Sequence, residues 1–594
     1  MVCCPHCQYE STARFFCGRC HQLLPVTFQA ALPGAVTLED GRVVDCSSWG
    51  GIWPADGWTP RPGVSGDPSC RVYALNRTSW RDVSADVTAR AGVALDVLAP
   101  LEVITVGDAA LVVAGGLAGG RPALLDPDPS DADLFDRLDA ALVACGHLER
   151  ALTPLHAAGL VWLGFDPARL DIYGDGVQIR GLDLRCFPRG ACPSGLRLLP
   201  AYSAPETGTY QCEAIGPATD VFHVCLYLYY RLAGLLPLGF PGNGVEAFDF
   251  DLPALRIYCP DLPPGIAPVL ERGLERDPER RFLSVADLTA ALADAIARAR
   301  RRRSSDVAIR IDSAAGSRIG AMHVALGMPN QDAFGLASIG PDTLLAVVAD
   351  GVSLASVGTG DRASEIALDR LAGGLPDRLM GVGRDGIDEL LSRAFYETSE
   401  AIFADALGDT PHIGIDPVEL MSSTALVGLV RGNELTVASV GDSRAYLIAD
   451  GIAEQLTVDG DVRCVELAAG LPPEHVPLLG NEAFALFSCL GIGESQPDGH
   501  LVPSRERSRP SITRWVLLPG DVIILCTDGL AEEGMFLGAA DLARIVADLR
   551  GTSAVGVVER LIEAANECGR PPSEREPHGR GDDITCVVMG IAAR

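Results

Sequence analysis

The pattern of apolar and polar positions changes character about half-way along the chain. Between residues 34 and 299, short apolar runs alternate with stretches of helical period, and the most apolar stretch, residues 223–240, contains His223 and Arg231. Charged residues inside so apolar a run predict a buried core helix rather than a membrane span. The arginine and serine run at residues 299–305 predicts a polar linker. Beyond it, β-branched runs punctuated by aspartates predict a second, strand-rich domain.

Four strand-like runs in the second half each adjoin an aspartate. They precede Asp350, Asp442 and Asp528, and follow Asp582. A single aspartate after a strand is usually a turn residue. Carboxylates at the ends of several buried strands, however, can converge on one sheet edge and hold hard divalent cations through oxygen. The pattern therefore predicts a metal site at the edge of a packed sheet.

Seven short segments of this half, in order, resemble the type 2C family of metal-dependent serine/threonine phosphatases. They are residues 330–333 (NQDA), 348–351 (VADG), 422–425 (SSTA), 440–444 (VGDSR), 518–521 (LPGD), 526–530 (CTDGL) and 581–585 (GDDIT). For residues 306–594 the resemblance implies an α/β sandwich of two antiparallel sheets flanked by helices. It also implies hydrolysis of phosphoserine or phosphothreonine by a metal-activated water, without a covalent phosphoenzyme.

The same resemblance implies the ligands of two to three magnesium or manganese ions. Asp350 bridges the first two ions in this scheme, and the Gly351 carbonyl completes one shell. Asp528 and Asp582 hold the first ion, and Asp442 with Asp528 holds a weaker third. The full set of expected metal-site residues is Asp350, Gly351, Asp442, Asp528, Asp582, Asp332 and Gln331.

The chain departs from the family pattern at several positions. Gln331 stands where the family often has glutamate, and a neutral amide adds no charge, so we expect the second ion to bind more weakly. The position of the phosphate-gripping arginine reads Gly327, while His323 stands in the arginine's place in an upstream segment. His323 is a candidate to contact substrate, and an ordinary loop histidine is the equal alternative. Val352 replaces the acidic histidine of some members, so protonation of the leaving group falls to water. The expected catalytic residues are Asp350, Asp528, Asp582 and His323.

Two CxxC pairs lie close together in the first thirty residues. Cys4 and Cys7 form one pair, and Cys17 and Cys20 form the other. Four thiolates suit tetrahedral zinc, and a segment too short to bury a core needs metal binding to fold. Residues 1–30 are therefore predicted to form a zinc ribbon around one structural zinc ion.

Several segments between residues 34 and 299 resemble the C-terminal lobe of a protein kinase, which is an α+β domain. They are residues 155–160 (LHAAGL), 201–206 (AYSAPE), 219–222 (TDVF) and 274–281 (LERDPERR). By this resemblance, Glu206 of the APE segment forms a buried ion pair with Arg281. An unrelated helical domain is the alternative.

The chemical groups of a kinase are missing from this region. The positions of the HRD catalytic motif read Trp162, Leu163 and Gly164, and the metal-binding Asn position reads Arg169. The DFG position reads residues 181–183 (GLD), and the whole chain contains no lysine to clamp the nucleotide phosphates. The region is therefore predicted to be a pseudokinase, a binding or regulatory module.

The composition of the chain limits the classes of molecule that it can bind. A formal net charge of -30 predicts repulsion from nucleic acid and from anionic membrane surfaces. Eighteen cysteines without a recognisable export signal predict metal ligands and buried thiols rather than disulfides, and a cytoplasmic location.

The whole chain is thus interpreted as a zinc ribbon (1–30), a pseudokinase (34–299) and a phosphatase (306–594) that acts on a phosphorylated protein. A partner kinase is one candidate ligand of the middle region. The main alternative function is a non-catalytic signalling adaptor, built from a pseudokinase and a dead phosphatase. Retention of the four strand-end aspartates argues against the adaptor.

Overall fold

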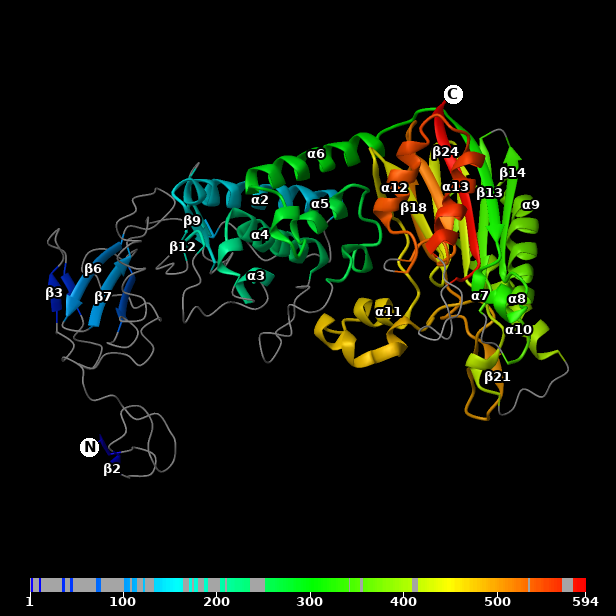
Figure 1. The fold of residues 1–594 in the computed structure, drawn as a ribbon, viewed down its shortest axis with the longest axis horizontal. Coiled ribbons are helices and arrows are strands. Elements are labelled where there is room, and N and C mark those ends of the chain that lie inside the picture. The colour runs from blue at the N-terminus through cyan, green and yellow to red at the C-terminus, as the bar shows by residue number, and fades with distance from the viewer. Residues whose placement is uncertain are drawn as a thin grey trace. The chain divides into compact units, whose positions relative to one another are not determined.

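The computed structural model describes short strands between residues 2 and 122 and most of the chain from residue 133 onward. The gaps after residue 133 are 164–169, 174–175, 180–185, 191–202, 209–210, 235–251, 341, 353–355, 409–414, 533–534 and 569–580. The chain divides into two compact units (Figure 1). The first comprises Met1–Asp249 with Leu270–Ala291, and the second comprises Phe250–Val269 with Leu292–Arg594.

Short antiparallel strands open the first unit. They are β1 (Val2–Cys3), β2 (Glu10–Ser11), β3 (Ala35–Thr37), β4 (Val43–Asp45), β5 (Arg71–Leu75), β6 (Leu101–Val106), β7 (Ala109–Ala114) and β8 (Arg121–Pro122). Strands β5, β7 and β6 form one sheet in that order, and β1 pairs with β2. The four predicted zinc ligands, Cys4, Cys7, Cys17 and Cys20, lie outside the described residues.

The rest of the first unit is mainly helical. Its elements are α2 (Leu134–Ala157), β9 (Leu160–Trp162), β10 (Leu170–Tyr173), β11 (Gly176–Ile179), β12 (Cys186–Pro188), α3 (Pro205–Gly208), η4 (Cys212–Ala214), α4 (Pro217–Ala233) and η7 (Pro278–Arg280). Helices α2 and α4 pack against each other, and both contribute buried leucines to the core of this unit. Asp133 caps α2 by accepting a hydrogen bond from the backbone N–H of Phe135, at 2.8 Å.

The predicted ion pair between Glu206 and Arg281 is confirmed. Two guanidinium nitrogens of Arg281 donate to the two carboxylate oxygens of Glu206, at 2.8 and 3.0 Å, and both side chains are buried. Arg281 also donates to the carbonyl of Ala218 at 3.1 Å, and its guanidinium lies over the ring of Phe222. A bidentate pair with extra acceptors can tolerate such burial, whereas a lone charge could not.

Two predicted boundaries differ from the structure. The buried helix expected over residues 223–240 is α4, which begins at Pro217 and ends before Gly234, a residue in the left-handed conformation that commonly terminates helices. The arginine run expected in a linker forms the last turn of α6 (Val285–Arg303). Cations there interact favourably with the negative end of the helix dipole, which explains why the helix continues through four arginines.

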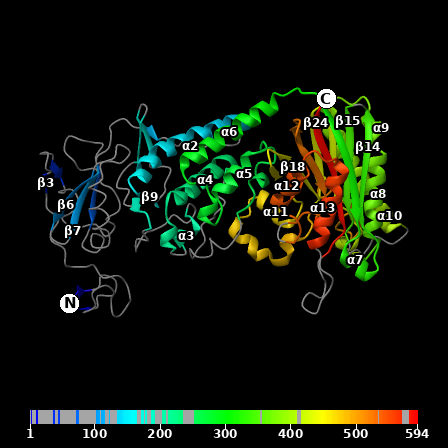
Figure 2. The same cartoon turned by 45° about the horizontal axis from the view of Figure 1, so that its top comes forward.

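The second unit contains two five-stranded antiparallel sheets (Figures 1 and 2). One has the order β13-β24-β23-β18-β19 and the other β14-β15-β16-β17-β22. The strands are β13 (Ile309–Arg318), β14 (Asp332–Gly340), β15 (Thr343–Asp350), β16 (Ala425–Arg431), β17 (Glu434–Val440), β18 (Arg444–Ala449), β19 (Ile452–Gln455), β22 (Ser511–Val516), β23 (Val522–Cys526) and β24 (Ile584–Ala593). A separate hairpin consists of β20 (Gly493–Ser495) and β21 (Leu501–Pro503).

Helices cover the outer face of each sheet. The helical elements of this unit are η6 (Leu255–Ile257), α5 (Ile266–Gly273, which continues into the first unit), α7 (Ala321–Leu326), α8 (Gly360–Leu368), η8 (Asp369–Gly373), α9 (Leu375–Leu379), η9 (Arg384–Gly386), α10 (Ile387–Leu407), η10 (Pro417–Glu419), α11 (Val462–Ala468), η11 (Pro473–Phe484), α12 (Ala539–Asp548) and α13 (Ala554–Cys568). One apolar core fills the space between the sheets. A second lies under α8–α10, and a third under α12 and α13. The predicted sandwich of two antiparallel sheets flanked by helices is confirmed for this half of the chain.

Segments that precede residue 306 complete the second unit. Arg256 forms a buried ion pair with Glu454 on β19, and its guanidinium lies 4.9 Å from the ring centre of Trp515. The backbone N–H of Gly265 donates to Glu454 at 2.7 Å, and Arg302 bonds to Asp521 at 3.1 Å. The compact unit therefore begins earlier in the sequence than the expected boundary at residue 306.

Most described cysteines are buried free thiols, as expected. Cys145, Cys225, Cys259, Cys464, Cys489, Cys526 and Cys586 are buried, and Cys568 is half-buried. Cys212 is disulfide-bonded, so the prediction of thiols without disulfides is wrong at that residue. The prediction rested on composition, which cannot reveal a pair that the fold brings together. The cytoplasmic location stays a prediction.

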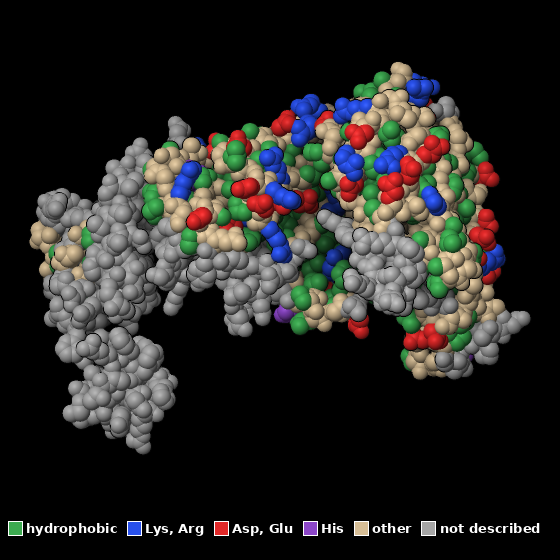
Figure 3. All heavy atoms as spheres, in the orientation of Figure 1, with side chains coloured by type: hydrophobic (Ala, Val, Ile, Leu, Met, Phe, Trp, Pro, Cys, Tyr) green, Lys and Arg blue, Asp and Glu red, His purple; other side chains and the backbone are tan. Residues whose placement is uncertain are grey.

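Charges of both signs are interspersed on the described face in Figure 3. Many are paired, as Arg362 is with Asp405 at 2.9 Å and Arg378 with Glu397 at 2.8 Å. Among the helices in the described part of the chain, none is both long and apolar enough to cross a membrane.

Candidate metal centre

Two of the predicted metal-site aspartates face each other across a pair of strands. Asp350 is the last residue of β15, and Asp332 is its register partner at the start of β14. The backbone of Asp350 is fixed by Thr424, whose N–H donates to the Asp350 carbonyl at 2.8 Å and whose hydroxyl accepts the Asp350 N–H at 3.0 Å. Asp332 accepts a hydrogen bond from the Thr527 hydroxyl at 2.9 Å. Both carboxylates are therefore held at one end of the sandwich.

The other three aspartates also lie beyond strand ends. Asp442 follows β17, Asp528 follows β23, and Asp582 precedes β24. Strands β23 and β24 pair with Cys526 opposite Cys586, so Asp528 and Asp582 emerge at the same end of their sheet. This is the convergence that the strand pattern predicted.

The electrostatics reveal how close these carboxylates are. Burial, followed by repulsion from Asp332, Asp528, Asp582 and Asp442, holds the pKa of Asp350 well above its usual value. Burial, followed by the charge of Asp528, likewise raises the pKa of Asp442. Burial and the charge of Asp582 raise the pKa of Asp528. The protein alone does not compensate five adjacent negative charges.

The donor atoms fit hard divalent cations. One carboxylate oxygen of Asp332 and one of Asp528 are buried, and neither has a hydrogen-bond partner within the described residues. A buried oxygen without a partner is costly, and magnesium or manganese would satisfy it. The residues present therefore fit the cations that the resemblance implies.

Backbone geometry at Gly351 explains why glycine follows Asp350. A side chain there would place its first carbon 2.1 Å from the carbonyl oxygen of Gly360, which is too close. The N–H of Gly351 donates to the Gln331 carbonyl at 3.1 Å. Gln331 is buried, and its amide oxygen lies close to Gly360. A first side-chain carbon added at Gly360 would be 2.9 Å from that oxygen. Gly351 and Gln331 thus both adjoin the carboxylate cluster.

Contacts between residues next to Asp442 and the segment after β19 hold this part of the cluster in place. Arg444, two residues further on, donates to Asp459 at 2.7 Å, and both side chains are largely buried. Gln455 at the end of β19 also donates to Asp459, at 2.9 Å. The segment after β19 is tied to the cluster by the Gly460 N–H, which donates to the Gly441 carbonyl at 2.8 Å.

Asp583 is the residue that the sequence interpretation missed. Its carboxylate is buried and accepts hydrogen bonds from the Gly320 N–H at 2.7 Å, His323 Nδ1 at 2.8 Å and the Gln331 N–H at 2.6 Å. The only signal in the sequence was its place beside Asp582. Potential ligand atoms of His323, Asp582 and Asp583 all lie within 4.8 Å of one another.

His323 is only 1% exposed, and its ring is held by Asp583. This burial favours a structural or positioning role over the alternative of an ordinary loop histidine. The expected contact between His323 and substrate stays a prediction.

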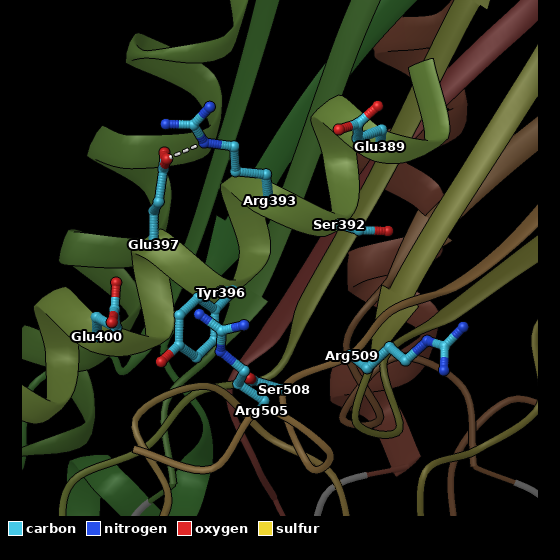
Figure 4. Close-up of a pocket in the computed structure, with 9 residues that line it drawn as sticks. All are labelled: Glu389, Ser392, Arg393, Tyr396, Glu397, Glu400, Arg505, Ser508 and Arg509. Carbon is cyan, nitrogen blue, oxygen red and sulfur yellow. Dashed lines mark hydrogen bonds and ion pairs between the residues drawn. The ribbon is translucent and has the colours of Figure 1, made fainter. Parts of the chain in front are cut away.

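A surface pocket of about 540 Å³ lies elsewhere in this unit, between α10 and residues 505–509 (Figure 4). Its lining residues are Glu389, Ser392, Arg393, Tyr396, Glu397, Glu400, Arg505, Ser508 and Arg509, and no predicted metal-site residue is among them. Several of its charges are already engaged within the pocket, since Arg393 pairs with Glu397 at 2.6 Å and Arg505 lies over the Tyr396 ring.

Comparison with known proteins identifies the half of the chain that carries the carboxylates. Residues 319–564 match the family model "Protein phosphatase 2C", a range that ends before Asp582. These residues form a protein phosphatase 2C domain. The family consists of metal-dependent serine/threonine phosphatases.

Relatives of the phosphatase domain come from distant organisms. The mitochondrial protein phosphatase 1K of Xenopus laevis is 37% identical over 276 residues, which are 44% of this chain and 65% of the frog protein. The serine/threonine phosphatase stp of Listeria innocua is 24% identical over 246 residues, which are 41% of this chain and 83% of the Listeria protein. The chain thus covers less than two thirds of the frog relative. A serine/threonine phosphatase structure from S. agalactiae matches with a TM-score of 0.36 and 21% identity, over 47% of this chain and 99% of that one.

Proposed function

We propose that the phosphatase domain hydrolyses phosphoserine or phosphothreonine in a phosphorylated protein substrate. The observation that carries the proposal is the gathering of Asp332, Asp350, Asp442, Asp528 and Asp582 at one end of the sandwich, all with raised pKa values. One buried oxygen of Asp332 and one of Asp528 also have no hydrogen-bond partner among the described residues. A dead phosphatase would be free to lose some of these carboxylates, and this chain retains all of them.

Together, these residues would hold two to three magnesium or manganese ions. Asp350 would hold two of the ions and the Gly351 carbonyl one of them, Asp528 and Asp582 would hold the first ion, and Asp442 would hold a third. When bound, the ions supply an activated water and neutralise the negative charge of the phosphate group. The chain's own part is to hold the carboxylates in register through the strand ends and through Thr424, Thr527 and the N–H of Asp583.

The decisive experiment is release of phosphate from a phosphothreonine peptide by the full-length protein. We expect hydrolysis with manganese or magnesium and none after chelation. Asp350→Ala should reduce turnover by several orders of magnitude, because it removes the carboxylate that would hold two of the ions. Circular dichroism of the variant should match wild type. Inactivity of the wild type with both metals would establish the adaptor alternative instead.

We further propose that Cys4, Cys7, Cys17 and Cys20 hold one structural zinc ion. The double CxxC spacing supports this, because four thiolates complete a tetrahedral shell without an open position. Purified protein should contain one zinc per chain by atomic emission spectroscopy, and replacement of Cys4 and Cys17 by serine should remove it. Zinc retained in a chain that starts after residue 30 would contradict the assignment.

We also propose that the region before the phosphatase domain is a catalytically inactive kinase-like module with a regulatory role. Two local structures support the resemblance. One is the ion pair between Glu206 and Arg281, and the other centres on Asp220. This buried aspartate bonds to His156 Nε2 at 2.9 Å and accepts the Trp162 N–H at 2.8 Å. Asp220 thereby anchors the segment that stands where a catalytic loop would be, without supplying its chemical groups.

A further inference from the structure

The residue after Asp582 joins three separate segments of the phosphatase domain. The carboxylate of Asp583 accepts the Gly320 N–H on one oxygen, and His323 Nδ1 and the Gln331 N–H on the other. Gly320 and His323 belong to the start and middle of α7, and Gln331 belongs to the loop before β14. We propose that Asp583 and His323 are positioning residues, which set the location of Asp582 relative to Gln331 and Gly351.

Each link of this chain of contacts is short. The backbone N–H of Asp583 donates to the carboxylate of Asp582 at 2.8 Å. The Gln331 N–H donates to Asp583, and the Gln331 carbonyl accepts the Gly351 N–H at 3.1 Å. One continuous path therefore runs from the expected ligand of the first ion to the expected ligand of the second.

Packing makes the arrangement stiff. A side chain at Gly320 would place its first carbon 2.2 Å from the carbonyl group of Asp582, so α7 begins directly against the metal-site backbone. Asp583 is 2% exposed, and its three donors are fixed by backbone or by a ring. Movement of this carboxylate would require α7, the Gln331 loop and β24 to move with it.

A carboxylate is needed for this role because all three neighbours donate. An ionised aspartate offers two accepting oxygens, whereas asparagine offers one oxygen and an NH2 group that itself donates. Asp583→Asn would therefore place a donor against a donor in a buried site, and one N–H would lose its acceptor. His323 supplies the only side-chain donor to Asp583 among the described contacts.

The inference rests on the proposed function, and its main readout is metal binding rather than turnover. Residues that orient metal ligands typically contribute 10–100-fold to metal affinity. We expect Asp583→Asn and His323→Leu in the full-length protein to weaken manganese binding by about 10-fold or more, measured by isothermal titration calorimetry. His323→Asn should recover most of the affinity, because the asparagine amide can donate from nearly the position of Nδ1.

Asp521→Asn is the matched control. Asp521 is a similarly buried aspartate that accepts the Leu518 N–H at 2.8 Å and pairs with Arg302, but its contacts do not include the metal-site residues. It should lower the melting temperature without changing the manganese affinity. At saturating manganese, the KM of His323→Asn for phosphopeptide decides between the two roles of this residue. A positioning residue leaves the KM within about two-fold of wild type, whereas the expected contact with substrate would raise it and overturn the positioning role.

The outcomes separate this inference from the proposed function. Wild-type protein that neither binds manganese nor hydrolyses phosphopeptide would contradict both. Active wild type combined with unchanged manganese affinity in Asp583→Asn and His323→Leu would overturn only the positioning role. An equal loss of affinity in Asp521→Asn would overturn it too, because general destabilisation would then explain the effect. If Asp583→Asn does not fold, the His323→Leu and His323→Asn pair decides the question.

Discussion

At the scale of single residues, the charge of the metal centre depends on Gln331 as well as on the aspartates. Gln331 is buried, precedes Asp332 in the chain and turns its amide oxygen towards Gly360 beside Gly351. Five carboxylates already repel one another there, as the raised pKa of Asp350 records. A neutral amide limits that repulsion in the metal-free protein and reduces the attraction available to a second cation.

Gln331→Glu should therefore tighten the second ion and destabilise the metal-free fold. We expect the manganese concentration for half-maximal phosphatase activity to fall several-fold, because the added charge acts at short range in a buried site. The melting temperature in chelator should fall, since a further carboxylate adds to the repulsion among the buried carboxylates of the cluster. Gln496→Glu, on an exposed turn, is the control for net charge alone. An unchanged manganese requirement in Gln331→Glu would show that this side chain does not face an ion.

The difference between Asp350 and Asp583 shows what the sequence could predict at this scale. Asp350 follows an apolar run, so its place at a strand end is a local property that spacing reveals. Asp583 functions through Gly320, His323 and Gln331, which lie more than 250 positions away in the chain. Neither local period nor residue type indicates such contacts. The residue type of His323 marks it as a candidate site residue, but its buried position depends on the distant Asp583.

At the scale of elements, the edge of the phosphatase sandwich is completed by a segment from before residue 306. Arg256, in η6, donates to the carbonyls of Pro260 and Leu262 at 2.9 Å and pairs with Glu454 of β19. Burial raises the pKa of Glu454, while the charge of Arg256 opposes that shift. Removal of the arginine would leave a buried carboxylate without its counter-charge.

Arg256→Ala should accordingly cost about 3–5 kcal/mol of stability, the usual effect of removing one partner of a buried ion pair. Urea denaturation followed by circular dichroism measures the loss, because the chain has six tryptophans and the fluorescence of Trp515, which lies under the Arg256 guanidinium, cannot be followed alone. The control is Arg298→Ala, whose ion pair with Asp450 is long and exposed, and which should cost less than about 1 kcal/mol. Equal effects of the two substitutions would mean that the Arg256 contact adds no specific stability.

Element types were predicted more accurately than element ends. The strand-end aspartates followed from β-branched runs, which depend on burial of a sheet face, whereas the two-sheet sandwich followed from the resemblance to the type 2C family. The end of α4 at Gly234 and the continuation of α6 through Arg303 depend on cap geometry and on helix electrostatics. Arg302 also gains a tertiary partner in Asp521, 219 residues away, and composition alone reads such a run as a linker.

At the scale of the whole molecule, the compact units and the expected domains do not share boundaries. Residues 250–269 and 292–299 fall within the region predicted to be a pseudokinase, yet they belong to the unit that contains the phosphatase sandwich. Resemblance to a family marks where motifs lie, whereas packing decides which segments share a core. A phosphatase fragment that starts at residue 306 would lack Arg256, Gly265 and Arg302, so fragments should begin no later than Phe250.

The kinase-like region should be unable to transfer phosphate. Phosphoryl transfer depends on positioning and on charge neutralisation by lysine and metal ligands. Here Trp162 and Leu163 stand in the catalytic-loop positions, Arg169 stands where a metal-binding asparagine is expected, and the chain contains no lysine.

Full-length protein that carries Asp350→Ala, which prevents removal of any phosphate added, should incorporate no label from γ-labelled ATP with magnesium or manganese. Incorporation above that of a heat-denatured control would contradict the pseudokinase assignment. If this region regulates the phosphatase domain of the same chain, the full chain and residues 250–594 should hydrolyse phosphopeptide with different kinetics. Identical kinetics would leave recruitment of a partner, such as a kinase, as the remaining role of this region.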